Sequence, residues 1–240
     1  MLFSLRTSVR RLIHWVGGTD LLVLLSLLVV VTGLWAFCQL AGAVRAGETQ
    51  RLDERILCAL RDPNNSAVPI GPPWAGEVGR DLTALGGVAV LVLVTASVAG
   101  YLILCRKYHA LILLLLTIGG GLLISTLLKG YFDRPRPSVV PHLSYVSSSS
   151  FPSGHSLLAA VVYLTLGTLL ARLVARVRLK LYFLSVALVL TCLVGMSRVY
   201  LGVHYPTDVL AGWAAGLAWA VLCWLLARYL QRRGAVEKPM

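Results

Sequence analysis

The feature that most constrains this chain is a series of apolar stretches, each long enough to cross a lipid bilayer. Crossing the hydrocarbon core as a helix takes about 20 consecutive apolar residues. Six stretches qualify, at residues 20–43, 82–104, 109–128, 155–175, 181–200 and 207–230. Because lipid cannot satisfy backbone polar groups, apolar runs of this length predict helices. The expected fold class is therefore all-α, an integral membrane bundle of six transmembrane helices.

Composition and charge agree with a membrane class. Of the 240 residues, 58% are hydrophobic and 13% are charged, whereas an average soluble domain has about 25% charged residues. The net charge of +12 comes from basic residues scattered between the apolar stretches, which argues against nucleic acid as a partner and for membrane lipids. We expect one membrane domain over residues 1–240, and the sequence does not indicate an oligomeric state.

The basic residues also predict an orientation, because Lys and Arg accumulate on the cytoplasmic side of membrane spans. An even number of spans puts both termini on the same side. The basic residues on that side are Arg6, Arg10, Arg11, Arg106, Lys107, Arg172, Arg176, Arg178, Lys180, Arg228, Arg232, Arg233 and Lys238. We therefore expect a multi-pass protein of the inner (plasma) membrane with cytoplasmic termini. The long connecting segments 44–81 and 129–154 then face outward, which means the periplasm if the source is a Gram-negative bacterium.

The first outer connecting segment, residues 44–81, contains a predicted amphipathic helix at residues 50–62. Its apolar residues at helical spacing are Leu52, Ile56, Leu57 and Leu60, and its charged residues are Arg51, Asp53, Glu54, Arg55 and Arg61. Such a helix can lie on the membrane surface or pack on the tops of the spans, and the sequence favours neither placement.

The remainder of this connecting segment gives weaker predictions of structure. Residues 64–75 contain three prolines and predict a loop. Cys38 and Cys58 both fall near the outer face, and the sequence leaves open whether they form a disulfide.

Polar and ionisable residues next to the spans gather in three segments. These are Lys129–Pro137, Phe151–Ser156 and Ser197–Asp208. Ionisable residues at a membrane are costly and commonly functional. All three segments fall on the outer side in the predicted topology, so we expect them to meet in one layer at the membrane surface.

The residue types in these segments suit phosphoryl transfer. The transition state of that reaction carries negative charge on three oxygens, so catalysis depends on positioning and positive charge. Lys129, Arg136 and Arg198 supply cations, and arginine offers a planar fork that matches phosphate oxygens. Ser153 and Gly154 stand where a helix begins, and free backbone N–H groups there attract an anion.

Two histidines complete the predicted chemistry. His204 and Asp208 are four residues apart, a spacing that brings side chains onto one face of a helix, although Pro206 implies that His204 precedes the helix proper. An adjacent carboxylate holds an imidazole in one tautomer and stabilises the cation that forms as the ring attacks. His155, on a different helix, can then protonate the leaving group.

At these positions the chain resembles the type 2 phosphatidic acid phosphatase superfamily. Its first motif is a Lys, six residues and then Arg-Pro, its second is Pro-Ser-Gly-His, and its third is Ser-Arg, five residues, His, three residues and Asp. The matching residues are Lys129, Arg136 and Pro137, then Pro152 to His155, then Ser197, Arg198, His204 and Asp208. All defining positions are filled in order, within residues 129–208.

The resemblance implies a membrane lipid phosphatase with a role for each matching residue. His204 would attack phosphorus and form a phosphohistidine, Asp208 would support it, and His155 would be the general acid. The residues implied to bind phosphate are Lys129, Arg136, Ser153, Gly154 and Arg198. Water would hydrolyse the intermediate, and no metal or other cofactor is implied.

Other residues near the motifs receive weaker predictions. Asp133 and Arg134 lie inside the first motif but are not among its defining positions. We expect them to be loop or rim residues. His142 is expected in a loop that rims the site. Tyr145 and Phe151 are expected to touch the substrate.

Taken singly, several motif residues have ordinary structural explanations. Lys129 alone fits an interface lysine whose aliphatic chain lies along the apolar layer while its ammonium group reaches water. Ser153 and Asp208 suit helix caps. Only their joint occurrence at fixed spacing indicates a phosphatase.

Two competing functions fit parts of the pattern. Vanadate-dependent haloperoxidases have a similar set of motifs. Those proteins are soluble, however, and six predicted spans argue against that function. A non-catalytic carrier of lipid phosphates would not need His204 together with Asp208. Among substrates, undecaprenyl diphosphate is favoured because the site is expected to face outward. The alternatives are phosphatidylglycerophosphate, phosphatidic acid and a lipid A phosphate.

Overall fold

A computed structural model of the chain describes residues 21–144, 146 and 148–232. The basic residues within 1–20 and 233–240, on which part of the predicted orientation depends, lie outside these described residues. Tyr145 lies outside them as well.

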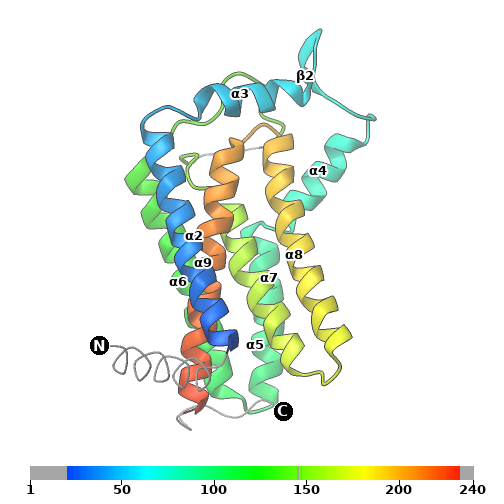
Figure 1. Cartoon of the computed structure of the whole chain (residues 1–240). Coiled ribbons are helices and arrows are strands. Elements are labelled where there is room, and N and C mark those ends of the chain that lie inside the picture. The colour runs from blue at the N-terminus through cyan, green and yellow to red at the C-terminus, as the bar shows by residue number, and fades with distance from the viewer. Residues whose placement is uncertain (1–20, 145, 147, 233–240) are drawn as a thin grey trace, which may run out of the picture.

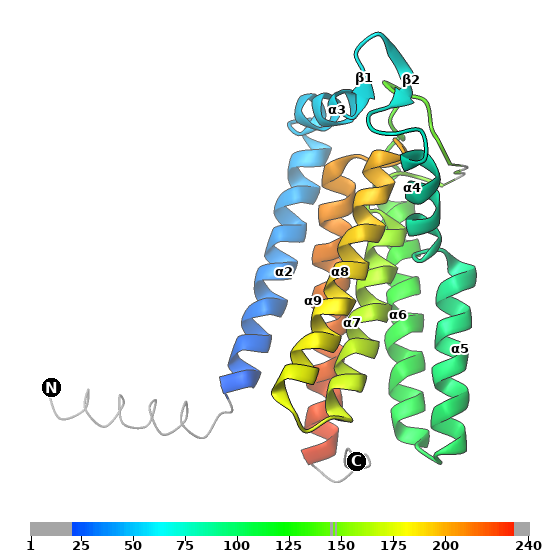
Figure 2. The ribbon, with the colours of Figure 1, turned by 90° about the vertical axis from the view of Figure 1, so that its right-hand side faces the viewer.

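Long helices run side by side and form a bundle (Figures 1 and 2). They are α2 (Leu21–Arg45), α5 (Val88–Leu104), α6 (Tyr108–Phe132), α7 (Gly154–Arg172), α8 (Val177–Tyr200) and α9 (Pro206–Arg232). Among the described residues, five helices are long and apolar enough to cross a membrane, or six spans if the bent pair that includes α5 counts as one. The expected all-α membrane bundle is therefore confirmed.

The second predicted span differs from its expected form. In place of one helix over 82–104, the structure has α4 (Ala75–Ala84) and α5, bent by 45°. The break falls where Gly86 approaches other elements closely, since a Cβ there would lie 2.4 Å from Val194 and 3.4 Å from His155. The bend therefore lies against α7, which carries His155, and α8, which carries Val194.

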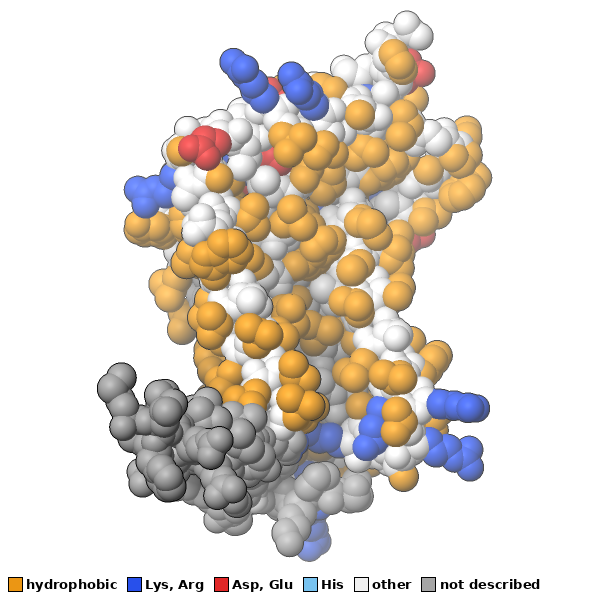
Figure 3. Space-filling model, viewed as in Figure 1, with side chains coloured by type: hydrophobic (Ala, Val, Ile, Leu, Met, Phe, Trp, Pro, Cys, Tyr) orange, Lys and Arg blue, Asp and Glu red, His pale blue; other side chains and the backbone are white. Residues whose placement is uncertain are grey.

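The surface of the bundle is apolar along its length. Leu93 on α5, Leu116 on α6 and Leu188 on α8 are among many exposed large hydrophobic side chains. In Figure 3, hydrophobic side chains cover the middle of one face, whereas Lys and Arg gather at its two ends. An exposed apolar band between charged ends is the arrangement expected of a surface that faces lipid.

The centre of the bundle is α7, whose side chains are largely buried between neighbouring helices. Gly212 and Gly216 allow α9 to approach it closely. A Cβ at Gly212 would lie 2.6 Å from the Ser153 carbonyl oxygen, and one at Gly216 would lie 2.5 Å from that of Leu157. Small residues permit such backbone contact in membrane helices. This packing joins the start of α7 to the start of α9.

Helix α3 (Gln50–Ala59) lies across one end of the bundle, here called the α3 end (Figures 1 and 2). It packs on the tops of the spans, which is one of the two predicted placements. Of its apolar residues, Leu57 is fully buried whereas Leu52 is 60% exposed, and Asp53 is completely buried as well. The buried face therefore contains only part of the apolar stripe, because a charged residue of α3 has partners inside the protein.

A short hairpin follows α3. Strand β1 (Arg61–Asp62) pairs in antiparallel fashion with β2 (Asn65–Pro69). The predicted loop at 64–75 thus contains a strand, because two nearby segments satisfy each other's backbone groups. Cys38 and Cys58 are both free thiols on the surface.

Candidate active site

The three polar segments meet at the α3 end. The first runs from the last turns of α6 into the loop after it, the second starts α7, and the third joins α8 to α9. This end therefore holds every residue predicted to be in the site, namely Lys129, Arg136, Ser153, Gly154, His155, Arg198, His204 and Asp208.

The turn between α8 and α9 carries His204. Gly202 has φ of 72°, a left-handed conformation that glycine adopts without steric cost. His204 is 1% exposed, and it precedes α9, which begins at Pro206. Asp208 lies in the first turn of α9 and accepts a hydrogen bond from the Tyr205 N–H at 2.9 Å. This contact holds the carboxylate back over the turn, with its Oδ2 3.4 Å from His204 Nδ1.

The neighbours of the His204 ring define its tautomer. Arg136 Nη1 lies 3.2 Å from His204 Nε2. A guanidinium only donates hydrogen bonds, so Nε2 accepts and the ring proton is on Nδ1, which faces Asp208. The lone pair of Nε2 therefore points toward the cationic side of the site.

Burial keeps the imidazole neutral. Removal from water lowers the pKa of His204 to about 4, and the nearby positive charges of Arg198 and Arg136 act in the same direction. The hydrogen bond and charge of Asp208 oppose this decrease in pKa but do not overcome it. At neutral pH the ring is thus uncharged, which is the state that a nucleophile requires.

Arg136 and Arg198 lie on this side of the ring, Lys129 lies near both of them, and protein groups hold each of these three cations. Arg136 donates from Nε to the Ser148 carbonyl oxygen at 2.6 Å and from Nη1 to that of Val203 at 2.6 Å. Lys129 Nζ donates to Ser148 Oγ at 2.9 Å. Arg198 donates from Nη1 to a threonine on α4, and within the described residues its buried Nε has no hydrogen-bond partner. The cations are positioned with donor capacity available for an anion.

The start of α7 closes the site from another side. Ser153 is its N-cap, and its hydroxyl accepts hydrogen bonds from the Ser156 N–H and Oγ–H. The Ser153 N–H donates to the Asp208 carbonyl oxygen at 2.9 Å. Gly154 lies against Lys129, since a Cβ at Gly154 would be 3.3 Å from Lys129 Cε. Free N–H groups of a first helical turn thereby lie beside a cation, as an anion site requires.

His155 belongs to the same cluster. Its ring is mostly buried and interacts electrostatically with Arg198, His204, Lys129 and Arg136. Two imidazoles, one from the first turn of α7 and one from the turn before α9, therefore share one positively charged site.

Arg134 lies in the loop after α6, one of the two predicted positions, but its burial was not predicted. It is 9% exposed and not at the rim. It donates from Nη1 to Asp208 Oδ1 at 2.6 Å and from Nη2 to Asp53 Oδ2 at 3.0 Å, and its guanidinium stacks on the Tyr205 ring. The only sequence signal was a second arginine in the motif loop, with no indication of its partners. Asp133 is exposed in the loop, as expected.

The remaining predictions near the motifs have mixed outcomes. Phe151 was expected to touch substrate, but it is fully buried and packs against Phe37 and Phe132, because an aromatic pocket formed by α2 and α6 receives it. His142 lies in the loop as predicted and contacts the Pro137 carbonyl oxygen at 2.7 Å. Among the described residues, no three His, Cys, Asp or Glu side chains are grouped as metal ligands.

Comparisons with known proteins agree with the motif resemblance. The sequence profile of the PAP2 superfamily matches residues 110–232. Phosphatidylglycerophosphatase B of Bacillus subtilis (strain 168) is 37% identical over 184 residues, which cover 75% of this chain and 86% of the relative. Lipid A 1-phosphatase of Rhizobium etli is 31% identical over 62% of this chain and 71% of the relative.

Solved structures give the same result. The crystal structure of a transmembrane PAP2-type phosphatidylglycerolphosphate phosphatase from Bacillus subtilis has a TM-score of 0.75 at 33% identity, and the match covers 85% of this chain and 98% of that one. LpxE from Aquifex aeolicus shares the fold, with a TM-score of 0.53 at 24% identity over 71% of this chain and 92% of that one. The chain is therefore a membrane-spanning member of the PAP2 superfamily.

Proposed function

We propose that the chain is a lipid phosphatase that transfers a phosphoryl group from a lipid phosphate to His204 and then to water. The observation that carries this proposal is the buried, neutral His204 ring, whose Nε2 lone pair faces Arg136. Cations beside a nucleophile stabilise the charge that develops on transferring phosphoryl oxygens.

The phosphate group would bind among the cations and the start of α7. Lys129, Arg136 and Arg198 would contact its oxygens, and the N–H groups near Ser153 and Gly154 would complete the cradle. Arg136 would move its hydrogen bond from His204 Nε2 to a phosphate oxygen, which frees the lone pair. In this arrangement the cations position the phosphoryl group and stabilise its charge, but they form no covalent bond to it.

In the first step, His204 Nε2 forms a bond to phosphorus while the bond from phosphorus to the lipid oxygen breaks. His155, which must begin this step as an imidazolium ion, donates a proton to that oxygen and becomes neutral, so that the lipid leaves as a neutral alcohol. The phosphohistidine ring keeps its proton on Nδ1 and carries positive charge, which Asp208 stabilises.

In the second step, water attacks phosphorus and the bond from phosphorus to Nε2 breaks. His155, now neutral, accepts a proton from the water molecule. Inorganic phosphate leaves, and His204 returns to its neutral form with the same tautomer. The proton that His155 gave to the lipid oxygen is thus replaced by one from the water molecule, and the Nδ1 proton of His204 does not move.

Phosphatidylglycerophosphate is the proposed substrate. Its support comes from the names of the Bacillus subtilis relative and of the solved structure with a TM-score of 0.75. Undecaprenyl diphosphate, which the sequence favoured, has no comparable support. A lipid A 1-phosphate is the second candidate, supported by the Rhizobium etli relative at 31% identity.

The test is phosphate release from a panel of purified lipid phosphates in detergent, with EDTA present. We expect hydrolysis of phosphatidylglycerophosphate that exceeds hydrolysis of undecaprenyl diphosphate and lipid A 1-phosphate. His204→Ala should abolish activity, a loss on the order of 10⁴-fold or more, with an unchanged melting temperature. Full activity of His204→Ala, or a requirement for added metal, would overturn the histidine mechanism.

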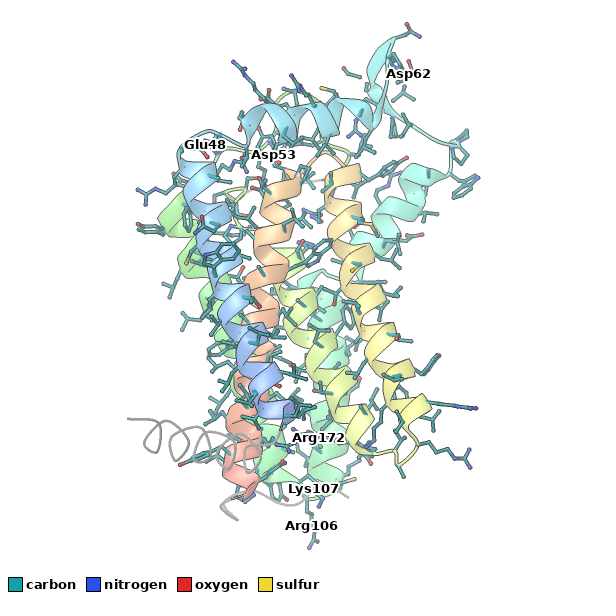
Figure 4. All side chains as sticks on the ribbon, in the orientation of Figure 1. Glu48, Asp53, Asp62, Arg106, Lys107 and Arg172 are labelled. Carbon is teal, nitrogen blue, oxygen red and sulfur yellow. The ribbon has the colours of Figure 1, made fainter. Side chains whose placement is uncertain are left out.

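The site is also proposed to face outward, away from the cytoplasm. Support comes from Arg106, Lys107 and Arg172, which lie at the end opposite α3 (Figure 4), because basic residues accumulate on the cytoplasmic side. A single cysteine at the exposed position Ser138, in a chain whose native cysteines are serine, should react with an impermeant thiol reagent on intact cells. Reaction only after permeabilisation would reverse the orientation.

A further inference from the structure

Arg134 links two carboxylates that are far apart in the sequence. Asp53 comes from α3 and Asp208 from α9, and both are completely buried. The Arg134 guanidinium lies between them, with Nη2 3.0 Å from Asp53 Oδ2 and Nη1 2.6 Å from Asp208 Oδ1. The motif residue Asp208 is therefore connected to a helix that carries none of the family motifs.

Other contacts attach α3 to the same turn. Asp53 accepts hydrogen bonds from the Thr207 N–H at 3.1 Å and the Thr207 hydroxyl at 2.6 Å. Gln50 donates to the Tyr205 hydroxyl at 3.0 Å and accepts from Arg134 Nη2 at 3.1 Å. Figure 4 shows Asp53 where α3 meets the bundle. Two residues of α3 thus contact three side chains around the start of α9.

The segment after α3 holds the other end of the turn. Arg61 is buried and donates from Nη1 to the Tyr200 carbonyl oxygen at 2.9 Å, where α8 ends. The stretch from Gln50 to Arg61 is therefore bound to both ends of the turn that contains His204.

The contacts of Asp208 explain why this matters for the nucleophile. Its Oδ1 receives Arg134, while its Oδ2 receives the Ser150 hydroxyl and the Tyr205 N–H and lies beside His204 Nδ1. With one oxygen held by Arg134, the other stays aimed at the imidazole. Any rotation of this carboxylate would turn the ring and displace Nε2.

The charge balance of the network gives Asp53 a second role. Two carboxylates share one guanidinium, so one negative charge remains uncompensated within the network. Because Arg134 is paired with Asp53 as well, it neutralises Asp208 only in part. Asp208 therefore retains negative charge beside His204. A buried carboxylate that was fully neutralised would stabilise the imidazolium less well.

We propose that Asp53 and Arg134 are positioning residues for phosphoryl transfer, which act through Asp208 on His204. The proposal rests on the proposed function and adds α3 to the parts of the chain that the reaction requires. Neither side chain contacts the three cations predicted to bind phosphate, so substrate binding should be independent of both.

The test compares steady-state kinetics of full-length variants on phosphatidylglycerophosphate. Asp53→Asn keeps the shape of the side chain but removes its charge, and we expect kcat to fall about tenfold with KM unchanged within about twofold. Small misplacements of a reacting group can lower rates by up to about 100-fold. Glu48→Gln is the matched control, because Glu48 is an exposed acid in the turn before α3 (Figure 4). It should leave both constants unchanged.

Arg134→Lys provides a second test of the proposal in case the Asp53→Asn variant does not fold. Lysine keeps the buried positive charge but lacks the fork that reaches two carboxylates, so kcat should fall with a retained melting temperature. In the double variant, Asp53→Asn should cause little further loss, because both residues act through one path.

The outcomes separate the two proposals. Asp53→Asn and Arg134→Lys proteins that keep the kcat of Glu48→Gln would overturn the positioning role while phosphatase activity stands. Losses that appear in KM alone, or that multiply in the double variant, would also overturn it. If wild type and Glu48→Gln release no phosphate from any lipid of the panel, the proposed function fails and this inference fails with it.

Discussion

The two ends of the bundle both carry many cations, but they hold them differently. At the end opposite α3, Arg106, Arg178 and Lys180 are exposed on the surface. At the α3 end, Arg134 and Arg198 are buried and hydrogen-bonded to other side chains. Cations at a membrane interface cost little and set orientation. Buried charges are costly unless they are paired. Among the residues that the structure describes, the buried arginines all lie at the α3 end, which is where the candidate site lies.

The comparison predicts that loss of a cation held inside the candidate site has the largest effect. Arg136→Ala removes the guanidinium that contacts His204 Nε2, and we expect kcat/KM to fall by about 10² to 10³, as for loss of one donor to a transition-state oxygen. Phosphate release from phosphatidylglycerophosphate measures the effect. Arg51→Ala, which removes an exposed arginine of α3, is the control. Equal activity of both variants would break the distinction between cations of the candidate site and exposed cations.

A smaller effect concerns pH. Burial lowers the pKa of His204 to about 4, so about 90% of the ring remains neutral at pH 5, whereas an ordinary pKa of 6.5 would leave about 3% neutral. As pH falls, Nε2 gains a proton and loses its lone pair, so the loss of active enzyme should begin near pH 4. Nitrogen NMR of the ring, assigned with His204→Ala, measures this pKa directly. Asp208→Asn should lower it further, and a titration near pH 6.5 in wild type would contradict the account.

The smallest effect is expected at the opposite end. Arg178 and Lys180 lie at the start of α8, exposed and far along the helix from the site. The double change to glutamine should alter kcat/KM by less than about twofold, as for surface substitutions in general. The same lipid assay measures it. A loss as large as that of Arg136→Ala would show that the two ends are coupled.

The features predicted correctly from sequence depend on local patterns. The spans follow from apolar runs, and the family follows from fixed spacings around His155 and His204. The burial of Arg134 could not be predicted because its partner Asp53 lies 81 residues away, and no spacing rule connects them. The burial of Asp53 on α3 was missed for the same reason. A buried carboxylate needs partners, and only the fold brings to Asp53 the arginine and the threonine that pair with it.

The break in the second span was missed for a related reason. Residues 82–104 are apolar enough for one continuous helix, and glycine alone does not stop a helix in a membrane. The bend depends on contact of Gly86 with Val194 and His155, which exists only in the assembled bundle. The roles of the individual site residues likewise remain predictions until kinetics test them.

The central claim is that His204 Nε2 becomes covalently bound to phosphorus. The direct measurement is rapid acid-free quenching of the enzyme during turnover of lipid labelled with radioactive phosphate, followed by peptide mapping. The account predicts a label on the peptide that contains His204, stable in alkali and lost in acid as a phosphoramidate is, and absent from His204→Ala. A label that survives acid, or one that persists in His204→Ala, would contradict it.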